Sequence, residues 1–270
     1  MKVRVGTYVL LGLYAVVNLY PFVWMISGAF KNDRDVFADW SLVPDHPTLD
    51  TFATTWTELD FPLYFLNSVL VTGATVLGVL VVYSLAAYAF AVLDFPGRRV
   101  IYAGFISLLF VPGITVLLPV VLLQQELGIL GTRLGIVLPF VNGTAPLSIL
   151  LRTNAFRAVP ASLRESARCD GAGEVRTFAS IHLPVRKPAL VTIALLTAVP
   201  TWNEYVLSRV SLGDPSTYTL PLGLQSLTAM TSPEYNVIMA ASLIIVLPVV
   251  LLFVFGQRYF VNGLVGAIKG

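Results

Sequence analysis

The sequence predicts an all-α polytopic membrane protein with six transmembrane helices and a helical cytoplasmic connection. Of its 270 residues, 56% are hydrophobic and only 12% are charged, about half the charged share of a soluble domain. Long apolar segments recur along the whole chain, and basic residues gather in alternate connections between them. These three observations favour a single transmembrane domain over residues 1–270.

Six apolar segments are the candidates for membrane spans, because a helix needs about 20 apolar residues to cross a bilayer. We expect the spans at residues 7–30, 63–93, 100–123, 134–151, 189–207 and 236–256. Together they cover about half of the chain, and Glu204 is the one formally charged residue in them. The second segment is too long for one straight crossing, so it should tilt or extend beyond the lipid.

The distribution of Lys and Arg predicts the orientation of the chain, since cytoplasmic connections carry the excess of basic residues. The two ends and the even-numbered connections hold thirteen of the 17 basic residues: Lys2, Arg4, Arg98, Arg99, Arg152, Arg157, Arg164, Arg168, Arg176, Arg186, Lys187, Arg258 and Lys269. The odd-numbered connections hold the other four. We therefore expect both termini in the cytoplasm, which requires an even number of spans.

Several functional classes are disfavoured by what the sequence does not contain. A net charge of +2 gives no support for a nucleic-acid partner. No lysine follows Gly and precedes Ser or Thr, as a phosphate-binding loop of an ATPase requires. Cys169 is the one cysteine, and His46 and His182 fall on opposite sides of the predicted membrane. We expect no catalytic residues and no metal ligands in this chain.

The connection at residues 152–188 holds the most informative pattern. Ser162 and Glu165 have the spacing of a capping box, which predicts the start of a short helix. Gly171 should end that helix, because glycine readily takes the left-handed conformation found just after helix ends. So short a helix is unstable alone in water. It could be buried by its own membrane domain, by a separate cytoplasmic protein, or on the lipid surface.

A second helix is expected directly after the first. Asp170 is placed to cap it, and Val175, Phe178 and His182 recur at helical spacing. Pro184 should end it.

These residues resemble the E-A-A loop of binding-protein-dependent ABC importer permeases. The match consists of Glu165-Ser166-Ala167, Asp170-Gly171-Ala172, Phe178, Ile181, Leu183-Pro184 and Pro188, with Ser166 replacing the usual second-position alanine. Tyr20-Pro21-Phe22, Asn67-Ser68 and Trp202-Asn203-Glu204 are similar to further segments of the carbohydrate-uptake branch. The C-terminal QRYFVNGLVGAIKG is similar to the tail of the smaller, maltose-permease-like subunit.

The resemblance implies a type I ABC importer permease fold and a function. The chain would be the non-catalytic permease subunit of an ATP-driven importer for a sugar or sugar derivative, in a bacterial or archaeal plasma (inner) membrane. It implies as partners a second, homologous permease in a heterodimer, two cytoplasmic ATPase subunits and an extracytoplasmic solute-binding protein. This chain would bind no cofactor, and ATP and Mg would be held by the partner ATPase.

The resemblance also implies roles for residues on the cytoplasmic side. The coupling helix that docks in the ATPase would comprise Leu163, Arg164, Glu165, Ser166, Ala167, Asp170, Gly171 and Ala172. In the resembling subunits the C-terminal tail inserts between the two ATPases, which would involve Asn262, Gly263, Leu264 and Gly266. For the tail, the alternative is a frayed terminus. It is expected to be too short and Gly-rich to fold by itself.

On the outer side and in the membrane the pattern is less specific. The family's binding-protein contact loop would fall at Asp214, Pro215, Pro221 and Pro233, where an ordinary surface loop is the alternative. Asn67, Asn203 and Glu204 are candidates for the substrate path. For both asparagines we favour hydrogen bonds between helices, and Glu204 could simply be exposed to solvent.

Two other functions compete with an ATP-driven importer. An ion-coupled secondary transporter commonly shows inverted repeats and buried acids, but residues 1–135 and 136–270 show no clear repeat. A membrane-embedded enzyme would need a convergent cluster of His, Asp or Cys. The sequence leaves the identity of the sugar open, and a homodimer remains an alternative to the heterodimer.

Overall fold

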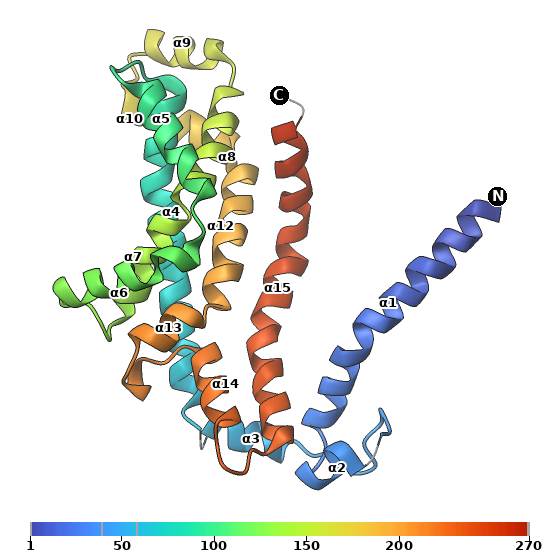
Figure 1. Ribbon diagram of the computed structural model, residues 1–270. Coiled ribbons are helices and arrows are strands. Elements are labelled where there is room, and N and C mark those ends of the chain that lie inside the picture. Colours follow the sequence, from blue (N-terminus) through green and yellow to red (C-terminus); the bar gives the residue numbers. More distant parts are fainter. Residues whose placement is uncertain (1, 39, 58, 269–270) are drawn as a thin grey trace. The chain divides into compact units, whose positions relative to one another are not determined.

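The computed structural model describes the backbone of residues 2–38, 40–57 and 59–268, and the side chains of residues 6–38, 40–57 and 59–257. Every regular element in these ranges is a helix (Figure 1), which confirms the predicted all-α class. The chain divides into two compact units. The first comprises Met1–Leu66 and Tyr218–Pro248, and the second Asn67–Thr217 and Val249–Gly270.

The first unit contains four complete helices and the beginnings of two long ones. These are α1 (Lys2–Ala29), α2 (Asp33–Ala38), α3 (Asp50–Thr57), α14 (Leu220–Thr228) and the first turns of α4 (Phe61–Val92) and α15 (Tyr235–Ile268). Polar contacts join its distant segments. The Asn236 amide donates to the Lys31 carbonyl at 3.2 Å, and the Tyr235 backbone N–H donates to Asp33 at 2.7 Å.

The second unit contains the rest of α4 and α15 and a series of shorter helices. They are α5 (Arg98–Ser107), η1 (Leu108–Phe110), η2 (Gly113–Val116), α6 (Leu117–Glu126), α7 (Arg133–Gly143), α8 (Ala145–Arg157), α9 (Ala161–Cys169), α10 (Glu174–Thr177), η3 (Phe178–His182), α11 (Leu183–Val185), α12 (Lys187–Trp202), α13 (Val206–Ser211) and η4 (Pro215–Thr217).

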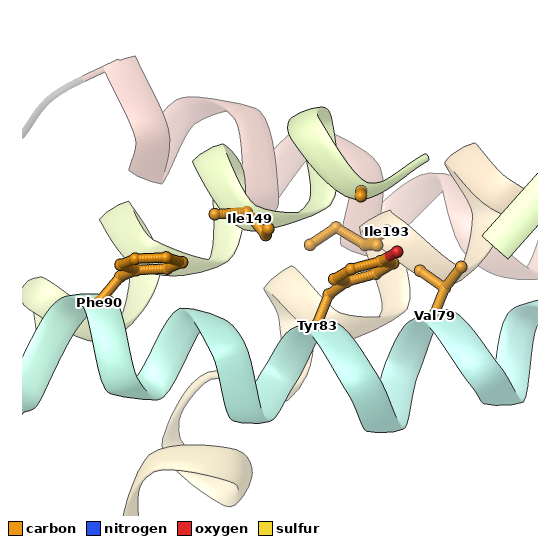
Figure 2. Packing of buried hydrophobic residues seen from close by; sticks show 6 residues of the cluster. Val79, Tyr83, Phe90, Ile149 and Ile193 are labelled. Carbon is orange, nitrogen blue, oxygen red and sulfur yellow. The ribbon is translucent and has the colours of Figure 1, made fainter. Parts of the chain in front are cut away.

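The core of the second unit lies where α4, α8 and α12 meet. Figure 2 shows Val79, Tyr83 and Phe90 of α4 with Ile149 of α8 and Ile193 of α12. All five are buried. Fully burying a side chain of the size of Val, Ile or Phe contributes about 1.5–3 kcal/mol, so this cluster fixes α8 and α12 along α4. It thereby positions the segment 158–186 that links these two helices.

Three helices are long and apolar enough to cross a membrane singly: Gly6–Ala29, Phe61–Val92 and Tyr235–Gln257. Three bent pairs pass the same test when taken together. They are Arg98–Phe110 with Gly113–Glu126, Arg133–Gly143 with Ala145–Arg157, and Glu174–Val185 with Lys187–Trp202. By length and composition the described residues therefore provide three spans, or up to six if each bent pair is one span.

Three of the expected spans differ from the observed helices. The one expected at residues 134–151 is divided into α7 and α8, which are bent by 48°. The segment expected at residues 100–123 is bent by 99° at Val111-Pro112, where both residues are extended. Proline disfavours a helical conformation in the residue before it, so the helix breaks there. The segment expected at 189–207 ends earlier, because α12 stops at Trp202 and α13 begins at Val206.

Candidate functional site

Helix α9, the predicted coupling helix, starts two residues earlier than expected. Its N-cap is Pro160, and no side chain caps it. Because the helix already begins at Ala161, Ser162 lies inside its first turn and cannot serve as the N-cap. The predicted capping box of Ser162 and Glu165 is therefore wrong.

The C-terminal end of α9 matches the prediction for Gly171, whose φ is +78°. The Gly171 N–H donates to the Arg168 carbonyl at 3.0 Å, and the Ala172 N–H donates to the Ala167 carbonyl at 2.8 Å. These two bonds form a Schellman motif. Asp170 is the C-cap of α9 in this motif, and Gly173 is the N-cap of the next helix. The expectation that Asp170 caps the second helix was therefore wrong.

The second helical segment continues from α10 through a π-helical turn, η3, into α11. Pro184 lies inside this continuous segment, which ends at Val185, one residue after the predicted end. The π turn also changes the expected face. Phe178 and His182 pack on Tyr88 of α4, with ring centroids 5.2 and 4.9 Å away, whereas Val175 is exposed.

Glu174, which the sequence analysis did not single out, accepts hydrogen bonds from both neighbouring segments. Its carboxylate accepts from Arg164 at 2.9 Å and from Arg168 at 2.7 Å, both on α9. It also accepts from the Tyr88 hydroxyl on α4 at 2.6 Å. Arg164 and Arg168 are four residues apart, so they share one face of α9. That i, i+4 spacing was the signal in the sequence that could have identified a shared acid.

These hydrogen bonds keep Glu174 charged. Glu174 lies in the connection at 152–188, outside the predicted spans. The hydrogen bond from Tyr88, followed by those from Arg168 and Arg164, lowers the pKa of Glu174 to about 2. Its carboxylate is therefore ionised at neutral pH, and α9 is held by charge-assisted hydrogen bonds.

The predicted coupling residues on the rest of α9 are accessible. None of the residues of α9 is buried, and Glu165, Ser166, Cys169 and Asp170 are exposed. Leu163 exposes 41% of its surface. Arg164, Ala167 and Ala172 are half-buried. The eight predicted coupling residues thus lie together in α9 and in the turn that follows it. Arg164 is turned towards Glu174 of its own chain.

Arg152, expected in a cytoplasmic connection, is instead fully buried in α8. Its Nη1 donates to the carbonyls of Val79 and Leu80 at 2.9 and 3.0 Å and to the Ser84 hydroxyl at 2.8 Å, all on α4. Its Nε and Nη2 have no hydrogen-bond partner in the described part of the chain. Arg152 lies one residue beyond the span expected at 134–151, and α8 continues past that predicted end to Arg157.

The three candidates for the substrate path occupy different environments. Asn67 is fully buried, donates to the Ser216 carbonyl at 2.9 Å and accepts from Arg133 at 2.8 Å. Asn203 is exposed at the end of α12, and its amide donates to the Val199 carbonyl at 2.8 Å. The structure does not bring these two together with Glu204 in one hydrogen-bond network.

Glu204 is 9% exposed, which argues against simple solvent exposure. Its carboxylate accepts from the backbone N–H groups of Leu207 and Ser208 at 2.6 and 2.9 Å and thereby satisfies the first turn of α13. It also borders a cleft of about 450 Å³. The cleft is mainly apolar, and its lining includes Ile114, Leu117, Phe140, Thr144 and Leu207.

The segment at residues 208–235, expected as an outer loop, is more regular than a loop, because it contains η4 and α14. Asp214 is exposed, and its carboxylate accepts from the Ser216 N–H at 2.9 Å. Pro215 begins η4, Pro221 lies in the first turn of α14, and Pro233 precedes α15. At the other end of the chain, α15 continues through Asn262, Gly263, Leu264 and Gly266. The backbone of the tail is therefore helical up to Ile268 as the end of this long helix, and its side chains lie outside the described residues.

Comparisons with known proteins identify the family. Residues 78–265 match the model of the "Binding-protein-dependent transport system inner membrane component" family. The chain belongs to this family. It is 31% identical to the galactooligosaccharides transport system permease protein GanQ of Bacillus subtilis, over 100% of this chain and 99% of that relative. It is 32% identical to the trehalose/maltose transport system permease protein MalG of Thermococcus litoralis, over 96% and 94%.

A solved structure agrees with the family assignment. The fold matches a bacterial ABC transporter involved in the import of the acidic polysaccharide alginate, with a TM-score of 0.87 and 25% identity over 96% of both chains. The chain is thus an ABC importer permease of the type I fold, embedded in the membrane. Permease subunits of this family are non-catalytic. The predictions of family, fold class and permease function are confirmed, and the ion-coupled alternative is not supported.

Proposed function

We propose that this permease carries an oligosaccharide or sugar derivative across the membrane and is driven by a separate ATPase that docks on α9. The observation that carries the docking proposal is the asymmetry of α9. Its arginine face is attached to Glu174 of its own chain, while Glu165, Ser166 and Asp170 remain exposed. An exposed helix with one anchored face suits a partner that engages it from outside.

The cargo proposal rests on the relatives. GanQ and MalG are named for galactooligosaccharides and for trehalose and maltose, and the structural neighbour takes part in alginate import. All of these are sugars or sugar polymers. The cleft beside Glu204 and Asn203 at the adjacent helix end are our candidates for the substrate path, whereas the hydrogen bonds of Asn67 favour a packing role.

The proposed assembly contains this permease, a second homologous permease in a heterodimer, two cytoplasmic ATPases and an extracytoplasmic binding protein. ATP and Mg would be bound by the ATPases. We place both termini in the cytoplasm, with six spans in a bacterial or archaeal inner membrane. We assign the outer segment around Asp214, Pro215, Pro221 and Pro233 to the binding protein, and the tail at Asn262, Gly263, Leu264 and Gly266 to a second ATPase contact.

The docking role is tested by substitutions on the exposed face of α9. We expect Glu165→Lys and Gly171→Asp to abolish uptake and co-purification of the ATPase while the chain stays in the membrane. The first reverses a charge at the interface, and the second places a side chain at φ +78°, where L-residues are strained. Glu126→Lys, on an exposed residue at the end of α6, is the matched control. Normal uptake by both α9 variants would refute docking.

The cargo is tested with the importer purified together with its companion subunits and reconstituted in vesicles with its binding protein. The probes are radiolabelled galactobiose, maltose, trehalose and an alginate trisaccharide. We expect ATP-dependent accumulation of at least one of them. Accumulation of none would overturn the sugar assignment and leave the docking proposal to its own test.

A further inference from the structure

We propose that Glu174 is the positioning residue that transmits movements of the docking helix α9 to the membrane helix α4, through its hydrogen bond with Tyr88. The inference rests on the proposed docking of an ATPase on α9 and adds the route by which that docking reaches the bundle. It concerns residues that lie entirely within the second unit.

The first step is how α9 is held. Since α9 has no fully buried residue, apolar packing contributes little to its attachment to the bundle. Its inward face is attached by Arg164 and Arg168, whose guanidinium groups both donate to Glu174 Oε1 at 2.9 and 2.7 Å. Two donors one helical turn apart on one oxygen fix both the position and the rotation of α9 relative to Glu174.

The second step is how Glu174 is tied to the membrane helix. Its other oxygen, Oε2, accepts from the Tyr88 hydroxyl at 2.6 Å. Tyr88 is 5% exposed and lies in the last turns of α4. The carboxylate thus uses one oxygen for α9 and the other for α4, so a displacement of α9 alone must lengthen one set of bonds.

The third step is the close packing of other rings around the Tyr88 ring. The Tyr88 ring lies against Phe178 and His182 at 5.2 and 4.9 Å and against Phe156 of α8 at 6.4 Å. Phe156 is 1% exposed. Close-packed aromatic clusters deform little, so a pull on the Tyr88 hydroxyl acts on α4 and α8 together instead of being absorbed by a mobile ring.

The variant that isolates this link is Tyr88→Phe. It removes the hydroxyl that reaches Glu174 but keeps the ring in its aromatic cluster and leaves the exposed face of α9 unchanged. Tyr83→Phe makes the same change at a buried position of the same helix and is the matched control. Glu174→Ala, which removes both carboxylate oxygens, interrupts the same link from its other end.

Hydrogen–deuterium exchange of the assembled importer, with and without ATP and vanadate, tests the relay without a sugar. In the wild type we expect nucleotide to change exchange in peptides 161–172 and 85–97. In Tyr88→Phe the change at 161–172 should persist and the change at 85–97 should fall at least about fivefold, the lower end of typical coupling factors. Glu174→Ala should give the same loss at 85–97, and the double variant should add nothing further there, since both variants interrupt the link between Tyr88 and Glu174.

The outcomes separate the two proposals. A wild-type change at 161–172 with equal changes at 85–97 in Tyr88→Phe, Glu174→Ala and the wild type would overturn the relay alone. No nucleotide-dependent change at 161–172 in the wild type would overturn docking itself. A loss at 85–97 in Tyr83→Phe equal to that in Tyr88→Phe would show a general loosening of α4 and would also overturn the relay. If Tyr88→Phe fails to assemble, Glu174→Ala decides by the same criterion.

Discussion

At the scale of single residues, Arg152 places a guanidinium in the interior of the second unit without a salt-bridge partner among the described residues. One of its nitrogens carries three hydrogen bonds to α4, while two others have no described partner. The carbonyls that it contacts belong to a helix and are already used within it, so they lose little without Arg152. A buried charge of this kind is costly and is more often kept for function than for stability.

We therefore predict that Arg152→Met leaves the thermal unfolding temperature of the purified complex unchanged or raises it, while sugar uptake falls. Methionine fills a similar volume and requires no hydrogen bonds, and such replacements of buried charges are often neutral or stabilising by about 1–4 kcal/mol. Thermal unfolding and uptake would be measured on the same preparation. A clear drop in unfolding temperature would show that the bonds to α4 outweigh the cost of burial.

At the scale of helices, the sequence predicted where the chain is apolar better than where each helix begins. Gly171 was placed correctly because a left-handed turn has a strong residue preference. The capping box failed because Pro160, two residues before Ser162, is the N-cap of α9, and proline fixes its own conformation whatever follows. The link through Glu174 could not be predicted, since Tyr88 lies 86 residues away in the chain and meets it only after α4, α8 and α12 have packed.

Close helix packing gives a second prediction. A Cβ on Gly223 of α14 would lie 2.3 Å from Cδ2 of Tyr64, which is 7% exposed at the start of α4. We expect Gly223→Ala to destabilise the protein by about 1–3 kcal/mol, as overpacking typically does, visible as a lower thermal unfolding temperature. Gly104→Ala is the control, because a Cβ there meets no atom within 4 Å. Equal unfolding temperatures for the two variants would contradict this packing.

At the scale of the whole molecule, most of the long helices expose apolar surface. In α1, none of the residues in the most apolar stretch between Gly6 and Ala29 is buried within the chain. Such a surface is stable only against lipid or other subunits. The composition predicted this, because so few charged residues cannot cover a chain of this length, but it could not predict which neighbour covers which helix.

The energy source gives a whole-molecule prediction. In sealed vesicles we expect uptake to require ATP and the binding protein and to continue when an ionophore collapses the ion gradients. The reason is that this permease has no described cluster of buried acids for ion relay, and its family works with separate ATPases. Uptake that stops with the ionophore while ATP stays constant would favour the secondary-transporter mechanism.

A cysteine at the end of α9 allows docking of the ATPase on this helix to be measured directly. Cys169, the chain's only cysteine, ends this helix and is exposed. The chain therefore carries a single thiol at the proposed ATPase-docking site, and no cysteine has to be introduced for labelling. A membrane-permeant maleimide should alkylate Cys169 quickly in the permease alone and slowly once the ATPase is docked on α9. The rate of this alkylation would therefore report assembly of the importer inside living cells.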